Sequence, residues 1–164
     1  MSQRIVIDCL PFARDARVLQ GELPIAMFER VQDMLTDSVG FVRYRVEGAV
    51  GPRNRAQLHL QLDGVLSLCC QRCLEGVGFQ LQVANVLEFI DNEDELTQEE
   101  LEDDSKDFLP AQSEVDVVAL IEDEIILGLP SAPRHESCAL PSAAQEDGVV
   151  SPFAVLKSLK PKAQ

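Results

Sequence analysis

Residues 41–90 alternate between apolar and polar side chains, and this pattern limits the possible folds more than any other feature of the sequence. Successive side chains of a β-strand point to opposite faces of a sheet, so a period of two predicts strands with one buried face. Three groups of residues supply the apolar face: Val42, Tyr44 and Val46; Leu58, Leu60, Leu62, Leu66, Leu68 and Cys70; and Phe79, Leu81, Val83, Leu87 and Phe89. The pattern predicts an antiparallel meander with one face on a core.

Turn and breaker residues separate these runs. Gly51-Pro52-Arg53-Asn54 predicts the first turn and Glu75-Gly76 the second. Gly64 interrupts the row of leucines, which predicts a bulge or a kink there. The phase of the row places Cys70 with the buried leucines and Cys69 on the outer side.

One helix is predicted before the strands of the sheet in the sequence, and one after them. Residues 23–35 place Ile25, Phe28 and Val31 at helical spacing, with Pro24 in the first turn. Residues 117–127 follow the N-cap residue Asp116 and end before Gly128 and Pro130. Residues 4–10 alternate weakly and predict a short strand before the first helix.

We therefore expect one α+β domain over residues 1–138. Its antiparallel sheet would have about four or five strands packed with the two helices. A long acidic loop would occupy residues 91–113, with Thr97 and Glu100 forming a capping box for a brief helix. Residues 139–164 are predicted to be a flexible tail that ends in a short basic amphipathic motif.

The net charge of −14 is concentrated in one segment. Residues 1–87 are neutral overall, whereas residues 88–107 carry a net charge of −10. An acidic surface repels nucleic-acid phosphates, but a localised acidic segment leaves the rest of the surface free to approach them.

The sequence predicts a cytoplasmic protein that does not enter a membrane. No apolar run approaches the length needed to cross a bilayer, and the first residues lack the pattern of a signal peptide. The five cysteines are an odd number, so we expect no framework of structural disulfides.

Two pairs of soft ligands predict a metal site. Cys70 and Cys73 lie at the expected hairpin tip, and His135 and Cys138 follow the second helix with the same spacing. Together they can hold one tetrahedral Zn²⁺ in a structural site. Two alternatives remain: Cys70 packs in the core beside a free Cys73 thiol, or the two cysteines form a thiol–disulfide redox pair.

Five arginines suggest an RNA-binding surface, because the planar guanidinium suits phosphate. They are Arg43, Arg45, Arg53, Arg55 and Arg72. The alternative is a solvated strand face on which they pair with Glu47 and Asp63. The chain has one tyrosine and no tryptophan, which disfavours sequence-specific reading of single strands by base stacking.

The last residues offer a second contact motif. Phe153, Leu156 and Leu159 have the spacing of a helix that binds a partner groove, and Lys157 and Lys160 belong to the same segment. The alternative is a disordered terminus.

Three stretches resemble the YceD family of bacterial proteins. They are Leu68-Cys69-Cys70-Gln71-Arg72-Cys73-Leu74, then Ile121-Glu122-Asp123-Glu124-Ile125-Ile126-Leu127-Gly128-Leu129-Pro130 with Pro133 and His135, and finally Ser151-Pro152-Phe153-Ala154-Val155-Leu156-Lys157-Ser158-Leu159-Lys160. The resemblance implies a non-enzymatic role in the synthesis, processing or stability of large-subunit (23S) ribosomal RNA. Some longer members carry further cysteines after the helix, where this chain has only His135 and Cys138.

The partners that follow from the resemblance are ribosomal RNA, large-subunit ribosomal proteins or assembly factors, without a small-molecule substrate. Two rival functions remain open from the residues themselves. One is a thiol–disulfide redox protein that uses Cys70 and Cys73. The other is an acidic adaptor that binds a basic protein and does not contact RNA.

Overall fold

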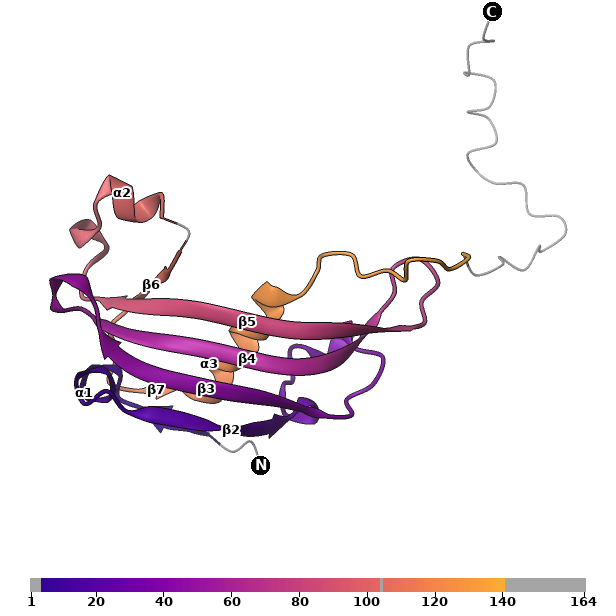
Figure 1. Cartoon of the computed structure of the whole chain (residues 1–164), viewed down its shortest axis with the longest axis horizontal. Helices are drawn as coiled ribbons and strands as arrows, with labels where there is room; N and C mark the ends of the chain where they lie inside the picture. Colours follow the sequence, from indigo (N-terminus) through magenta and orange to yellow (C-terminus); the bar gives the residue numbers. More distant parts are fainter. Residues whose placement is uncertain (1–3, 104, 141–164) are drawn as a thin grey trace, which may run out of the picture.

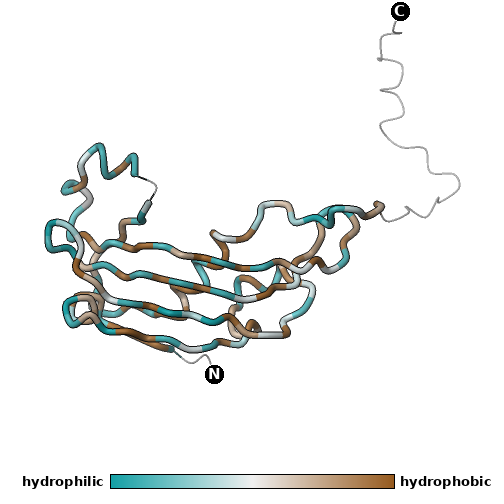
Figure 2. Tube along the Cα trace, in the orientation of Figure 1, coloured by the Kyte–Doolittle hydropathy of each residue, from teal (hydrophilic) through white to brown (hydrophobic). Residues whose placement is uncertain are grey.

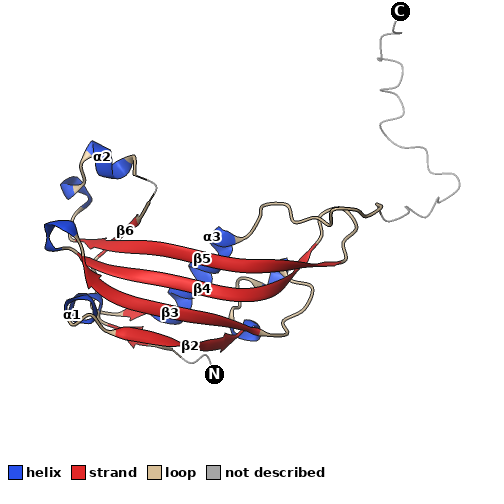
Figure 3. Cartoon of the chain, in the orientation of Figure 1, coloured by secondary structure: helices blue, strands red, loops and turns tan. Residues whose placement is uncertain are grey.

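The computed structural model describes residues 4–103 and 105–140 of the chain. One large twisted sheet dominates the molecule, and the helix α3 (Val117–Gly128) lies across one of its faces (Figures 1 and 3). Among the described residues, no helix covers the opposite face of the long central strands (Figure 3).

The longest strands lie in the middle of the sequence, and the elements before and after them are shorter. The strands are β1 (Val6–Ile7), β2 (Val18–Pro24), β3 (Phe41–Val50), β4 (Ala56–Cys69), β5 (Gly76–Ile90), β6 (Asp107–Pro110) and β7 (Val115–Asp116). The other helices are α1 (Cys9–Arg14) and α2 (Gln98–Leu101), and the 3₁₀ turns are η1 (Ile25–Met27), η2 (Gln32–Met34), η3 (Pro52–Asn54) and η4 (Glu93–Glu95).

The predicted antiparallel meander is confirmed. The five-stranded sheet has the order β2-β3-β4-β5-β6, and β2 to β5 pair antiparallel with their neighbours. β6 pairs in parallel with β5, and the sequence pattern did not predict this pairing. Gly64 was predicted to mark a bulge or a kink, and the bulge was wrong: Gly64 pairs with Val42 and Leu81 in an uninterrupted register. A β-carbon there would lie 3.2 Å from the Phe41 carbonyl oxygen, so close approach of the neighbouring strand accounts for the glycine.

The core lies between the sheet and α3. Apolar and polar segments alternate along the long strands (Figure 2), and the leucines predicted to share a face are all buried. Cys70 is fully buried and Cys69 is partly exposed, as the phase predicted.

The helix predicted over residues 117–127 is confirmed as α3. The Asp116 carboxylate accepts hydrogen bonds from the backbone N–H groups of Val118 and Ala119, so this side chain caps the helix. The spacing of its apolar residues predicts that Val117, Leu120, Ile121 and Leu127 face the sheet, but Leu127 is exposed and Ile125 is buried.

The helix predicted over residues 23–35 was wrong. Leu23 and Pro24 end strand β2, and the two 3₁₀ turns η1 and η2 follow. Ile25, Phe28 and Val31 are nevertheless fully buried. The amide of Gln32 donates to the carbonyl oxygens of Ile25 and Phe28, at 2.9 and 2.8 Å, and so satisfies groups that a helix would have paired.

The N-terminal strand is shorter than predicted. Only Val6–Ile7 pairs, with Asp116 and Val115 of β7, and the helix α1 follows directly. The Asp8 carboxylate accepts from the Leu10 N–H and caps α1, so the polar residue that was assigned to a strand starts a helix.

The acidic segment contains regular structure. The predicted capping box is confirmed: Glu100 N–H donates to the Thr97 hydroxyl, and Thr97 N–H donates to the Glu100 carboxylate at 3.0 Å. The turn η4, the helix α2 and the strand β6 all lie within the range 91–113 that was predicted as a loop.

Candidate metal centre

The hairpin between β4 and β5 brings the first two ligands together. Cys70 N–H donates to the Glu75 carbonyl and Leu74 N–H to the Cys70 carbonyl, both at 2.9 Å. Leu74 adopts a positive φ of 65°, which closes the turn. This tight turn holds Cys70 and Cys73 on the same side of the tip.

The chain after α3 supplies the other two ligands. It runs back along the sheet to the β4–β5 hairpin (Figure 1). There Gln71 N–H donates to the Pro133 carbonyl at 2.9 Å, which fixes the chain just before His135 and Cys138. Two segments more than sixty residues apart in the sequence therefore meet at the tip.

The four ligand atoms lie within 4.8 Å of one another, which allows them to hold one metal ion. The Cys70 and Cys138 sulfur atoms are 3.8 Å apart, and the Cys73 sulfur is 3.3 Å from His135 Nδ1. Usual tetrahedral bond lengths place two sulfur ligands about 3.8 Å apart and a sulfur–nitrogen pair about 3.6 Å apart. The separations therefore fit a tetrahedral centre.

A second layer of contacts orients the ligands. His135 Nε2 lies 3.0 Å from the Gly76 carbonyl oxygen, so a proton on Nε2 leaves Nδ1 unprotonated toward the sulfur atoms. Such a bond on the remote nitrogen is typical of metal-bound histidine. Arg72 Nε donates to Cys138 Sγ at 3.0 Å and Nη2 to the His135 carbonyl at 2.7 Å. Its charge offsets that of the thiolates.

The surroundings also favour the thiolate form of Cys70. Backbone N–H groups of Cys73, and then of Arg72 and His135, lower the pKa of Cys70 to about 5. Desolvation opposes them less strongly. The Glu75 N–H acts to lower the pKa of Cys73, but desolvation and the Cys70 and Cys138 thiols raise it above its usual value.

A low thiol pKa is also what a redox cysteine requires. Cys70, however, has no exposed surface and lies at a hairpin tip, without a helix N-terminus to activate it. A disulfide partner needs access to the attacking sulfur. All five cysteines are free thiols. The geometry therefore favours a closed ligand site over a redox pair.

The five arginines predicted to bind RNA lie in three places. Arg43 and Arg45 occupy the open face of β3, where they pair with Asp63 and Glu47. Arg72 belongs to the ligand cluster described above. Arg53 and Arg55 lie at the β3–β4 turn, at the other end of the sheet.

The β3–β4 turn holds the acidic segment in place. Arg53 and Arg55 each donate to a carboxylate oxygen of Glu100 at 3.0 Å. Arg55 also reaches Glu88, where Lys106 binds the second carboxylate oxygen at 3.0 Å. The side chains of Arg55 and Glu88 are only 9% and 1% exposed, so this pair is sealed from solvent.

Most of the residues described above lie within a match to a known protein family. Residues 58–160 match the family model described as "Large ribosomal RNA subunit accumulation protein YceD". The chain belongs to the YceD family. A family member from Haemophilus influenzae, named "Large ribosomal RNA subunit accumulation protein YceD", is 26% identical over 172 aligned residues, which cover 96% of each chain. No solved structure gives a significant match.

The match to the YceD family spans both ligand pairs, the acidic segment and α3. It also includes Phe153, Leu156 and Leu159, which lie outside the described residues. Their predicted role in partner binding therefore remains a prediction.

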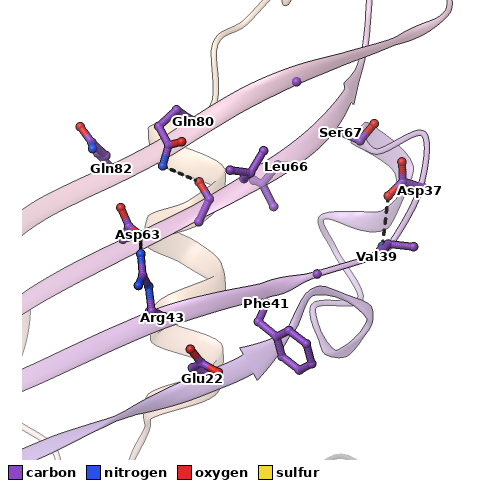
Figure 4. Close-up of a pocket in the computed structure, with 14 residues that line it drawn as sticks. Glu22, Asp37, Val39, Phe41, Arg43, Asp63, Leu66, Ser67, Gln80 and Gln82 are labelled. Atoms are coloured by element: carbon purple, nitrogen blue, oxygen red, sulfur yellow. Dashed lines mark hydrogen bonds and ion pairs between the residues drawn. The ribbon is translucent and has the colours of Figure 1, made fainter.

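Sequence reasoning missed one feature of this YceD-family sheet. The alternating pattern assigned no role to Phe41, which lies in the outer, polar phase of β3. The ring is 60% exposed beside an open groove on the helix-free face (Figure 4). A phenylalanine in the polar phase of an alternating strand was the available signal.

Among the described residues, no helix has the length and apolar character required to span a membrane.

Proposed function

We propose that this protein supports the accumulation of large-subunit ribosomal RNA as a non-enzymatic factor that acts by contact. The observation that carries the proposal is the match to the YceD family over residues 58–160, together with a relative of nearly equal length that bears this function in its name. The candidate site agrees with it, since four protein ligands around one ion leave no open position for a substrate.

We propose Zn²⁺ as the ion. Three sulfur ligands and one imidazole form a soft ligand set that favours zinc over magnesium or calcium. Bound zinc would connect the β4–β5 hairpin to the chain after α3. Its role would be structural, because it joins two segments that otherwise share only a few hydrogen bonds near Gln71 and Arg72.

The acidic segment is the surface best suited to a protein partner. Residues 88–107 carry a net charge of −10, and Arg53, Arg55 and Lys106 fix that charge in one place on the sheet. A fixed acidic surface attracts a basic protein and repels phosphate. We infer that a basic partner protein, such as a ribosomal protein or an assembly factor, contacts this segment.

RNA contact is the second candidate, and the open face of β3 favours it. The ion pairs of Arg43 with Asp63 and of Arg45 with Glu47 are solvent-exposed. Exposed pairs contribute about 0–1 kcal/mol, so a phosphate can displace the carboxylates. Arg55 is enclosed by its carboxylate partners and is not available in the same way.

Depletion and complementation test the function. Depleting the protein from its native cell should lower large-subunit ribosomal RNA and the large-subunit peak relative to the small one. The full chain should restore both. Unchanged RNA levels and subunit profiles after complete depletion would refute the proposed function.

Crosslinking in cells separates the two modes of contact. Glu99→Gln with Glu102→Gln removes exposed acidic charge outside the contacts that fix the segment. Arg43→Gln with Arg45→Gln removes the exposed arginines of the open face. We expect the first pair to reduce crosslinks to basic proteins. Loss of RNA crosslinks in the second pair alone would instead assign the contact to RNA.

A further inference from the structure

A groove lined by both apolar and polar side chains lies on the face of the sheet opposite α3, close to the candidate metal centre. It has a volume of about 1250 Å³ and extends over β3, β4 and β5 (Figure 4). Val39, Phe41 and Val65 line it and are 81%, 60% and 59% exposed. Three large apolar side chains in one groove form a surface that favours coverage by another chain segment.

The groove is also acidic. Glu22, Asp37 and Asp63 line it, and Arg43 is the one basic residue among the lining side chains that the structure describes. Arg43 is bound to Asp63, so the remaining charge is negative (Figure 4). A suitable occupant therefore combines apolar side chains with positive charge, and a phosphate chain is disfavoured.

The described part of the chain passes near this groove at His135, five residues before it ends at Leu140. The His135 ring contacts the Gly76 carbonyl at the start of β5, and Gly78, two residues further along β5, already lines the groove. Residues 141–164 follow in the sequence. Within them, residues 151–160 carry Phe153, Leu156 and Leu159 together with Lys157 and Lys160, and they contain no acidic residue.

We propose that residues 151–160 bind the groove of their own chain. The thirteen residues from Leu140 to Phe153 can span about 40 Å when extended. Only a few strand residues separate the hairpin tip from Phe41, so this length is sufficient to reach the groove. The apolar side chains of the segment cover Val39, Phe41 and Val65, and its lysines face the carboxylates of the groove. Hydrogen bonds at the hairpin tip hold the chain at Pro133 and His135, ahead of the segment. This inference goes beyond the proposed function and does not depend on it.

Attachment to the same chain makes weak binding sufficient. A short covalent connection gives an effective concentration on the order of millimolar, so an affinity too weak for a separate peptide still fills the groove.

Photocrosslinking in the full-length chain tests the inference. Benzoylphenylalanine replaces Phe41, the purified protein is irradiated at low concentration, and the products are mapped by peptide mass spectrometry. We expect crosslinks within one chain that map to residues 151–160. Phe153→Ser with Leu156→Ser should reduce their yield roughly tenfold or more, because two apolar contacts are lost.

Two matched controls define the result. Val149→Ser with Val150→Ser changes neighbouring apolar residues outside the segment and should leave the yield unchanged. Benzoylphenylalanine in place of His59, exposed on β4 and six residues from Val65, should give no crosslink to residues 151–160. Crosslinks from position 41 that map elsewhere, or that join two chains only, would refute the inference. Equal loss of yield in both serine pairs would refute it as well.

Discussion

Replacing one metal ligand gives the sharpest test of the candidate centre. Cys138→Ser removes a sulfur that lies 3.8 Å from Cys70 Sγ and accepts a hydrogen bond from Arg72. Structural zinc sites bind with about 10–16 kcal/mol, so each of four ligands contributes an average of about 2.5–4 kcal/mol. At about 1.4 kcal/mol for each factor of ten, we expect zinc affinity to fall roughly 60- to 700-fold.

The assay is metal analysis combined with competition against a chromophoric zinc chelator. Wild-type protein should hold one zinc per chain, and the chelator should remove the ion from Cys138→Ser at far lower concentration. Cys69→Ser is the matched control, because Cys69 neighbours Cys70 but faces the other side of the strand and is not a member of the cluster. Its zinc affinity should remain that of the wild type.

Two results would refute this reasoning. Wild-type protein purified under reducing conditions that binds no zinc would show that the cluster is not a zinc site. Equal affinities of wild type and Cys138→Ser would remove Cys138 from the ligand set. A lower unfolding temperature on chelation in the wild type, and no such change in Cys138→Ser, would support a structural role.

Three further predictions concern stability. Glu88→Gln should lower the free energy of unfolding by about 3 kcal/mol in urea titrations, because it removes the buried carboxylate that pairs with both Arg55 and Lys106 and leaves Glu100 as the remaining carboxylate partner of Arg55. Desolvation alone would raise the pKa of Glu88, but Gln57, Lys106 and Arg55 outweigh it and hold that pKa below its usual value. The stability that Glu88 contributes is therefore fully present above its unfolded pKa and is lost as the pH falls through its lower folded pKa. If the free energy of unfolding of the wild type, measured against pH, shows no such loss relative to Glu88→Gln, the prediction is contradicted. Burial raises the pKa of Glu124, so Glu124→Gln should preserve or increase stability at neutral pH. Any gain should disappear below about pH 4, where the carboxyl is protonated in both states. A large loss of stability at neutral pH would contradict this prediction. Gly48→Ala should lower the free energy of unfolding by about 1–3 kcal/mol, since its β-carbon would lie 2.3 Å from the Phe12 carbonyl oxygen. Gly78→Ala is the control: its β-carbon meets no atom within 4 Å, so thermal melts of the two variants should show a loss of stability in Gly48→Ala alone.

The central strands were predictable because one periodic pattern decides both their conformation and their burial. The leucines from Leu58 to Leu68 are buried in the predicted phase, and the register stays continuous through Gly64. The helix α3 was predictable from its start, since the Asp116 side chain caps it locally. Gly128 was expected just beyond the helix, but it is the last residue of α3, and Leu129 is the C-cap. The parallel pairing of β6 with β5 depends on contacts between separate elements, which a local pattern does not encode.

Residues 23–35 show where periodicity is ambiguous. Ile25, Phe28 and Val31 are spaced by three, which suits both an α-helix and successive 3₁₀ turns. Their burial was predicted correctly and their conformation was not. Arg30 attaches this segment to α3, since its backbone N–H and guanidinium both donate to the Glu122 carboxylate. A partner ninety-two residues away leaves no signal in the local sequence.

The cluster of ligands was predictable from spacing, because a tight turn brings two residues at i and i+3 to the same side. The structure places all four predicted ligands together. Arg72 was expected on an RNA surface, but it donates to Cys138 and His135. Spacing identifies ligands, whereas the residues that orient them depend on how the two segments meet.

The placement of the arginines limits how a chain with a net charge of −14 can approach RNA. Arg53 and Arg55 bind Glu100, so the residues that suggested an RNA surface instead fix the acidic segment against the sheet. Arg43 and Arg45 are exposed, but each is paired with a carboxylate. Phosphate would have to displace those carboxylates in the field of residues 88–107, whereas a basic protein is attracted by that same field. The electrostatics therefore favour a protein as the first partner, and RNA contact would follow most readily where that partner supplies the positive charge.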